Sequence, residues 1–256
     1  MEANKAAIEN IKVVERYSRA LYLDKAEIAI FKKLFGAPKD WNMLDIGIGA
    51  GRTTHYFAPV VKKYVGIDYS EAMSKICEDK YGGLNNVTVL TADARNMDMF
   101  PDEGFDFVLF SFNGIDFVSA EDRQKILLEM KRVAKTSSLL CFSSHNMYNL
   151  PVLYGFRYPF HPRAWLAEYR RILKLKRANK PMKELRKMLQ ASIADGDPDF
   201  TTQYIYIRPD EQIKQLRALG FTNIEVYSFY TGARIDNSTD WSIHRDPWIY
   251  YLFTKA

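Results

Sequence analysis

The hydrophobic pattern changes period repeatedly along the chain. Short apolar runs typical of buried strands alternate with segments whose apolar residues recur at helical spacing. The predicted strands cover 42–46, 63–67, 87–90, 105–110 and 138–143, and the predicted helices cover 52–57, 70–80 and 121–135. Strands that alternate with helices predict right-handed crossovers and a mostly parallel sheet with helices on both faces.

The two ends of the chain complete this pattern. Helical spacing over 12–35 ends at Gly36-Ala37-Pro38, and a second helix over 209–219 stops at Gly220. Two further strands follow, at 223–229 and near 248–253. We therefore expect a single α/β domain over 1–256, with residues 1–38 as an N-terminal helical cover.

Between 146 and 202 the pattern predicts no strand and two amphipathic helices. The apolar face of the first helix carries Trp165, Leu166, Tyr169, Ile172 and Leu173. The apolar face of the second helix carries Leu185, Met188, Leu189 and Ile193. We expect 146–202 to be a helical insertion, or lid, ahead of the closing helix and strands. Just after it, Tyr204 and Tyr206 alternate with Ile205 and Ile207, which fits either a strand or side chains that reach a pocket.

Composition fits one globular domain. The 256 residues are 47% hydrophobic and 14% aromatic with only 13 Gly and 10 Pro, which excludes disorder and fibrous repeats. The net charge of +5 is unevenly spread: residues 157–187 hold eleven Lys/Arg and two acids, a net +9, which leaves −4 for the rest. A lid with this charge would favour an anionic acceptor.

Compartment is inferred from three features. The N-terminus has no apolar stretch of signal-peptide kind, and no apolar run approaches the roughly 20 residues of a membrane helix. Cys77 and Cys141 form no CxxC pattern, so neither a disulfide framework nor a cysteine zinc site is expected. These features favour a cytoplasmic protein without a membrane span.

The most informative segment is LDIGIGAG at 44–51, which places glycines at 47, 49 and 51 between a predicted strand and a helix beginning near Arg52. Glycine is required where a backbone turns tightly and a ligand approaches without a Cβ in the way. A dinucleotide loop would need its third glycine at 52, where Arg52 stands. Asp45 adds a negative charge that suits a cationic amino-acid cofactor better than a pyrophosphate. The spacing therefore points away from NAD.

Two more acids follow the next two strands. Asp68 stands where a carboxylate usually accepts hydrogen bonds from ribose hydroxyls, and Asp93 where one can accept from an adenine amino group. Each alone could be a solvated or capping acid. Because the carboxyl ends of parallel strands meet at one sheet edge, three acids after three strands around one glycine loop indicate a nucleoside site.

In order and spacing, LDIGIGAG, VGIDYS, TADARN and FDFVLFSFNGID resemble the motifs of class I S-adenosylmethionine-dependent methyltransferases over about 40–145. The resemblance implies S-adenosylmethionine as cofactor and a doubly wound, mostly parallel seven-stranded sheet in order 3-2-1-4-5-7-6, with the last strand antiparallel. Ser111-Phe112-Asn113-Gly114 replaces the (N/D)PP(Y/F) tetrad of enzymes that methylate exocyclic amines of bases, which argues against that reaction.

The resemblance also implies cofactor residues. Asp45, Gly47, Gly49 and Gly51 would line the methionine end, Asp68 would hold the ribose, and Tyr69 would flank the adenine. Asp93 and Ala94 would contact the adenine edge, and Phe110 and Ser111 would close the site. Tyr17 or Tyr22 would cover the cofactor from the N-terminal helix, although core packing explains either tyrosine equally well.

Methyl transfer is an in-line displacement, and a hydroxyl, carboxylate or amine acceptor can need a base. His145 follows the fifth predicted strand, at the sheet edge of the cofactor acids, and is the first candidate for base or acceptor ligand. His161, at the entry to the insertion, is a second. Asn113 could orient an acceptor or simply form a turn. No grouping has metal-ligand spacing, so no metal is predicted.

Three functions fit these features. The first is a methyltransferase that acts on a small-molecule acceptor by O- or N-methylation. The second is a tRNA or rRNA methyltransferase whose basic segment 157–187 contacts phosphates, although the chain carries no separate RNA-binding module. The third, a non-catalytic cofactor-binding protein, fits poorly with intact glycines and acids. A basic amphipathic helix could also touch an anionic membrane surface. We favour the small-molecule acceptor.

Overall fold

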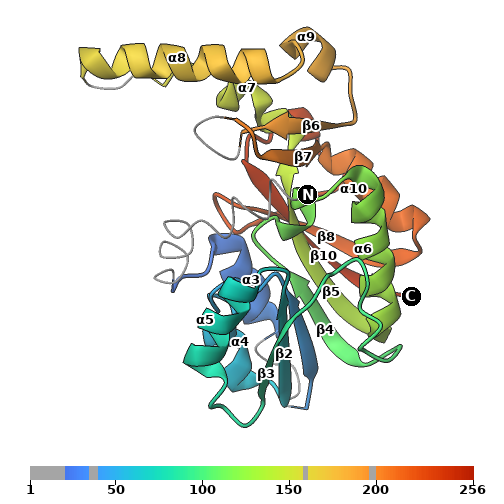
Figure 1. Cartoon of the computed structure of the whole chain (residues 1–256). Helices are drawn as coiled ribbons and strands as arrows, with labels where there is room; N and C mark the ends of the chain where they lie inside the picture. The colour runs from blue at the N-terminus through green and yellow to red at the C-terminus, as the bar shows by residue number, and fades with distance from the viewer. Residues whose placement is uncertain (1–20, 35–39, 158–160, 196–199) are drawn as a thin grey trace.

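The computed structural model describes residues 21–34, 40–157, 161–195 and 200–256 (Figure 1). The strands are β1 Asn42–Ile46, β2 Lys63–Asp68, β3 Val87–Thr91, β4 Phe105–Phe110, β5 Ala134–Asn146, β6 Gln190–Ala194, β7 Gln203–Ile207, β8 Phe221–Ser228, β9 Arg234–Ile235 and β10 Trp248–Lys255. The α-helices are α3 Lys25–Leu34, α4 Thr54–Phe57, α5 Glu71–Tyr81, α6 Ala120–Val133, α7 Leu150–Leu153, α8 Pro162–Ala178, α9 Met182–Leu185 and α10 Pro209–Ala218. A short 3-10 helix, η2 Gly114–Phe117, follows β4.

One sheet runs through the molecule in the order β3-β2-β1-β4-β5-β10-β8-β9. β3, β2, β1, β4 and β5 are parallel, whereas β10 is antiparallel to both β5 and β8. The seven main strands therefore have the expected order, with the last strand antiparallel and inserted beside the fifth. The doubly wound α/β class is confirmed, and β6, β7 and β9 are additional strands.

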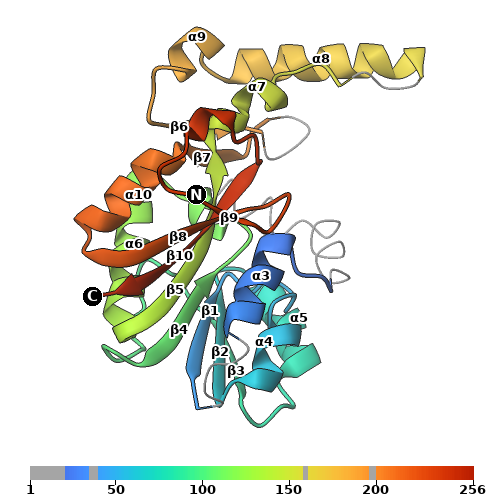
Figure 2. The same cartoon turned by 180° about the vertical axis from the view of Figure 1, so that it is seen from behind.

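Each central strand is buried on both faces because its successive side chains point into two helical layers. Leu44, Ile46 and Val108 belong to one core cluster with Ile126 and Leu216 of α6 and α10. Met43, Phe107 and Leu109 belong to the other, with Ala26 and Ile30 of α3 and Phe57 of α4. Figures 1 and 2 show these two sets of helices on opposite faces of the sheet. This packing fixes the carboxyl ends of β1 to β5 at one edge.

The predicted strands up to 143 and the helices between them are confirmed, with small shifts at their ends. Of the helix predicted over 12–35, residues 25–34 form α3, residues 21–24 have no regular secondary structure, and the remaining positions lie outside the described residues. The closing helix and strands are also confirmed, and Gly220 ends α10 with a φ of +81°.

The second helix predicted in the insertion is wrong. α9 covers only Met182–Leu185, and Gln190–Ala194 forms β6, antiparallel to β7. Ala191 and Ile193 are buried with Tyr206 in a separate small core, so the period in β6 is two. β7 in turn pairs in parallel with the end of β5, where His145 stands beside Tyr206. The alternation around Tyr204 and Tyr206 is thus that of a strand.

Candidate functional site

The loop after β1 depends on left-handed glycines. Gly47, Gly49 and Gly51 have φ of +67°, +54° and +88°, a region that L side chains rarely adopt. A Cβ on Gly47 would stand 2.7 Å from the Phe110 ring, and one on Gly51 would stand 2.5 Å from the Tyr81 ring. A Cβ on Gly49 would meet nothing within 4 Å. The loop is thus packed at its two ends and open to a ligand at its centre.

A cleft lies over this loop at the carboxyl ends of β1 to β4. Its apolar walls include Ile48, Ile67, Met73, Val118 and Ile126. The predicted cofactor residues that line it are Gly47, Gly49, Asp68, Tyr69, Asp93, Ala94, Phe110 and Ser111. Residues predicted from four separate motifs are therefore brought together around one apolar cleft.

Two carboxylates face this cleft, and their pKa values are shifted in opposite directions. Asp68 accepts backbone hydrogen bonds from Gly49 (2.8 Å) and Ser70 (2.8 Å), while burial raises its pKa above the ordinary value. Asp93 is held by the guanidinium of Arg95, with Nη2 2.5 Å from Oδ2, and this hydrogen bonding lowers its pKa. Arg95 also binds Asp122 and lines the cleft, a position that the motif does not indicate. A carboxylate oxygen has more than one lone pair, so Asp68 can still accept from a ligand hydroxyl.

The remaining predicted cofactor residues lie elsewhere. Gly51 packs against Tyr81 beneath the loop. Tyr22 is 52% exposed and its carbonyl accepts from Arg52, while Tyr17 lies outside the described residues. Asp45 is 1% exposed and accepts hydrogen bonds from Thr53 Oγ1 and Tyr64 OH, both at 2.5 Å, which ties the loop to β2. Burial raises the pKa of Asp45 to about 7.

A buried ion pair joins α3 to the start of α4. Arg52 donates from Nη1 and Nη2 to the two carboxylate oxygens of Glu27, each at 2.6 Å, and the two residues are 8% and 3% exposed. Glu27 also accepts from the backbone of Asp24 just ahead of α3, and from the hydroxyl of Ser111. Sequence reasoning missed Glu27, since nothing local links it to a residue 25 positions later. The pair fixes α3 beside the cleft, whose lining includes Arg52 and Ser111.

A histidine–aspartate pair stands at the carboxyl end of β5. Asp116 Oδ2 lies 2.9 Å from His145 Nδ1 and accepts from the His145 backbone at 2.7 Å. Ser144 donates to the other carboxylate oxygen, and the Arg123 guanidinium lies 3.5 Å away. Asp116 is fully buried, whereas the His145 side chain is 13% exposed. A carboxylate at Nδ1 fixes that nitrogen as the donor and leaves Nε2 able to accept a proton. Sequence reasoning did not single out Asp116; its place after the fourth predicted strand was the one signal that could have indicated it.

Aromatic rings connect this histidine to the cleft. The His145 ring centroid is 5.0 Å from that of Tyr204, which is 4.6 Å from Phe117. On its other side His145 is 6.2 Å from Trp248, which is 5.6 Å from Phe112. Phe117 and Phe112 both line the cleft. Strand β7, which follows the insertion, supplies Tyr204 and so contributes to the surroundings of His145.

Asn113 and His161 occupy different environments. Asn113 is 3% exposed, has a left-handed φ of +60°, and donates its backbone N–H to Ser143 Oγ at 2.8 Å. Its buried Oδ1 has no hydrogen-bond partner among the described residues. His161 is exposed just ahead of α8. No described residue of α8 is part of the cleft lining, so the lid over 146–202 stays a prediction.

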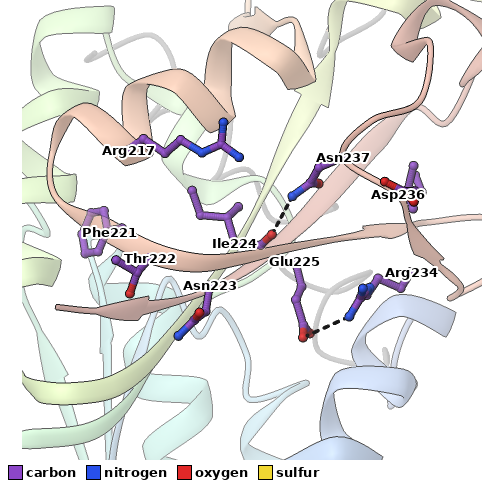
Figure 3. A pocket seen from close by; sticks show the side chains of 10 residues that line it. Arg217, Phe221, Thr222, Asn223, Ile224, Glu225, Arg234, Asp236 and Asn237 are labelled. Atoms are coloured by element: carbon purple, nitrogen blue, oxygen red, sulfur yellow. Dashed lines mark hydrogen bonds and ion pairs between the residues drawn. The ribbon is translucent and has the colours of Figure 1, made fainter.

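Other features of the described residues bear on the site. No group of three or more His, Cys, Asp or Glu side chains there could hold a metal ion, and no helix there is long and apolar enough to cross a membrane. Cys77 and Cys141 are buried and unpaired. A second hollow of about 570 Å³ lies along β8 and β9, away from the glycine loop (Figure 3). In it Glu225 pairs with Arg234 and Asn237 donates to the Ile224 carbonyl.

The fold and the glycine-loop cleft have the arrangement typical of a nucleoside-binding α/β domain. Residues 43–137 match the family model described as a methyltransferase domain. An uncharacterized methyltransferase, YcgJ of Bacillus subtilis (strain 168), is 26% identical over 138 residues, 53% of each chain. A demethylmenaquinone methyltransferase of Staphylococcus aureus (strain MRSA252) is 29% identical over 123 residues, 47% of this chain and 49% of its own. The chain thus spans about half the length of these curated relatives.

Solved structures agree on the fold. A methyltransferase of Thermotoga maritima, described as a possible histamine N-methyltransferase, aligns over 100% of both chains with a TM-score of 0.57 and 20% identity. An S-adenosylmethionine-dependent methyltransferase of Mesorhizobium loti aligns over 90% of this chain and 98% of its own, with a TM-score of 0.62 and 13% identity. Residues 43–137 thus match a methyltransferase domain, and the chain shares the fold of these S-adenosylmethionine-dependent methyltransferases.

The residues around the cleft fit S-adenosylmethionine as a ligand. The open space at Gly49 admits a ligand against the loop backbone, and the apolar walls suit the flat adenine ring. Asp68 and Asp93 offer acceptors at the ends of two successive strands, as a nucleoside requires.

Proposed function

We propose that the protein transfers a methyl group from S-adenosylmethionine to an oxygen or nitrogen of a small-molecule acceptor, with His145 as the base. The observation that carries this proposal is the Asp116–His145 pair at 2.9 Å, on the sheet edge that also carries the cofactor cleft. Bound S-adenosylmethionine would supply an electrophilic methyl group on a sulfonium.

We assign the cofactor ligands residue by residue. Gly47 and Gly49 would admit the methionine end, Asp68 would accept from the ribose hydroxyls, and Tyr69, Asp93 and Ala94 would contact the adenine. Asp45 and Gly51 would act from behind the loop, because Asp45 accepts from Thr53, Gly51 packs against Tyr81, and neither lines the cleft. Arg52 lines the cleft and would stay paired with Glu27. Phe110 and Ser111 would close the methyl end.

His145 would hold or remove the acceptor proton at Nε2. Asp116 would act as its positioning residue, since the contact at Nδ1 fixes both the tautomer and the ring plane. Asn113 would offer its buried Oδ1, which has no hydrogen-bond partner among the described residues, to a donor on the acceptor. His161 stays a second, weaker candidate because it is exposed and stands at α8.

A small molecule is favoured over RNA by two observations. The names of the demethylmenaquinone methyltransferase and of the possible histamine N-methyltransferase both support a small acceptor. The exposed basic residues of α8 are not part of the cleft lining, so they would give RNA phosphates no direct route to the methyl end.

A methyl-transfer screen tests the proposal. The protein is incubated with S-adenosylmethionine and fractionated cell metabolites, and mass spectrometry identifies the compound that gains one methyl group. We expect turnover of a small molecule to fall at least a hundredfold in His145→Gln, while cofactor affinity is retained. Methylation of the RNA fraction alone, or full turnover in His145→Gln, would contradict the proposal.

A further inference from the structure

Helix α8 carries an exposed apolar strip. Trp165, Leu166 and Tyr169 are 51%, 54% and 55% exposed, and Leu173 is half-buried. Successive residues of an α-helix are about 100° apart, so these four side chains fall within roughly 100° of the helix circumference. The sequence pattern grouped Ile172 with them, but Ile172 is 9% exposed and faces inward with the fully buried Leu175. The strip is therefore distinct from the face that packs.

The rest of the molecule holds this helix in place. Arg171 donates to the carbonyls of Leu153 and Gly155 at 3.1 Å and pairs with Glu168 at 2.8 Å. Asn179, just after α8, makes hydrogen bonds in both directions with Ala194 of β6, at 3.0 and 2.8 Å. Figures 1 and 2 show α8 at the end of the molecule remote from β3, extending beyond the sheet. The strip is thus presented outward on an anchored element.

Basic side chains continue around the helix from the apolar strip. Arg177, Arg170 and Lys174 occupy the next 80° or so of circumference, and all three are exposed. Lys176 stands at the C-terminal end of the strip. The surrounding segment 157–187 has a net charge of +9, against −4 for the rest of the chain.

We propose that α8 docks on an anionic lipid surface, with Trp165, Leu166, Tyr169 and Leu173 in the headgroup region and Arg170, Lys174 and Arg177 among the lipid phosphates. An apolar strip with adjoining cations is what an interfacial helix requires, since apolar burial and attraction to anionic lipid add together. We call these seven residues the docking strip.

Charge argues against a second copy of the chain, and the apolar side chains argue against RNA. A second copy seated on α8 by a twofold axis would bring two segments of +9 together, which is repulsive. RNA would satisfy the cations but leave Leu166 and Leu173 without apolar contact. The inference does not rest on the proposed methyl transfer, because no residue of the docking strip lines the cofactor cleft.

Co-sedimentation of the full chain with vesicles tests the proposal. We expect binding to phosphatidylcholine vesicles that contain phosphatidylglycerol, weakening with salt, and far less binding to phosphatidylcholine alone. Arg170→Gln, Lys174→Gln and Arg177→Gln together should lower the partition coefficient about a hundredfold, at roughly fivefold per residue. Leu166→Ser with Tyr169→Ser should lower it about tenfold or more. Trp165 should shift its fluorescence to shorter wavelength on binding, and Trp165→Phe should remove that shift.

Matched controls use exposed residues elsewhere. Lys75→Gln, Lys125→Gln and Lys214→Gln remove the same charge from the body, and Met99→Ser with Leu128→Ser remove apolar groups that are 53% and 48% exposed. Both control sets should bind vesicles like the parent, and all variants should keep its circular dichroism and melting temperature. Equal binding to neutral vesicles, equal loss in the controls, or no vesicle binding at all would overturn the proposal. So would docking-strip variants that alter only self-association or only tRNA binding.

Discussion

Removal of Glu27 tests the buried ion pair that joins α3 to the start of α4 beside the cleft. In Glu27→Ala, Arg52, which is 8% exposed in the parent, loses both of its 2.6 Å charge-assisted hydrogen bonds. The backbone N–H of Asp24 and the hydroxyl of Ser111 lose the same acceptor. An uncompensated buried charge costs about 3–5 kcal/mol, so the free energy of unfolding should fall by that amount.

Urea unfolding at pH 7, followed by circular dichroism, measures this loss. Arg52→Met with Glu27→Leu should recover most of the stability, because apolar groups of similar volume replace the whole pair. Lys33→Ala is the control: it breaks a pair with Glu225 in which Lys33 is 46% exposed, and it should cost about 1 kcal/mol or less. A Glu27→Ala loss as small as that of Lys33→Ala, or a double variant no better than Glu27→Ala, would refute the reasoning.

Three further predictions concern single positions. Asp116→Asn should lower turnover tenfold or more while leaving cofactor affinity unchanged, since it weakens the contact that orients His145 and Asp116 does not line the cofactor cleft. Equal effects on both in a kinetic and calorimetric comparison would count against a positioning role. The folded protein keeps the Asp45 proton up to about pH 7 and the unfolded chain releases it near 3.8, so stability falls as pH rises through this window, by on the order of 4 kcal/mol. Asp45→Asn should therefore flatten the stability profile from urea unfolding at pH 4.5 and 7.5, and an unchanged slope would be inconsistent with a buried neutral carboxyl. Gly51→Ala should lower the free energy of unfolding by about 2 kcal/mol or more in thermal unfolding, because φ at this position is +88° and the added Cβ would meet the Tyr81 ring. Tyr81→Ala in the same chain should restore part of this stability. No restoration would show that the ring is not the obstacle.

The central sheet was predictable because its signal is local. β1, β2, β4 and the middle of β5 are apolar runs, and burial on both faces explains why these runs are continuous, whereas the edge strand β3 is largely exposed. β6 was not predictable in the same way. Leu185, Met188 and Leu189 have helical spacing, yet Ala191 and Ile193 gain their burial from pairing with β7, a contact that the local pattern does not contain.

The site residues also divide into those with a local sequence signal and those that depend on a distant partner. Residues in the loops after β1, β2 and β3 were found from their motifs and lie around one cleft. Glu27 and Asp116 were missed because each acts on a partner 25 or 29 positions away, Arg52 and His145 respectively. Asp45 belongs to the motif, but it accepts a hydrogen bond from Tyr64 of the neighbouring strand β2 instead of lining the cleft. The motif alone did not reveal this orientation.

Calorimetric titration of S-adenosylmethionine is the most direct test of the central claim that the glycine-loop cleft holds this cofactor. The account predicts binding at one site per chain, and affinity lowered about tenfold to a hundredfold in Asp68→Asn, because a charged acceptor for the ribose hydroxyls is lost. The variant should stay folded but unfold at a lower urea concentration than the parent, because one of the two backbone N–H groups that Asp68 binds loses its acceptor. Absence of binding to the parent, or equal affinity in Asp68→Asn, would contradict the account.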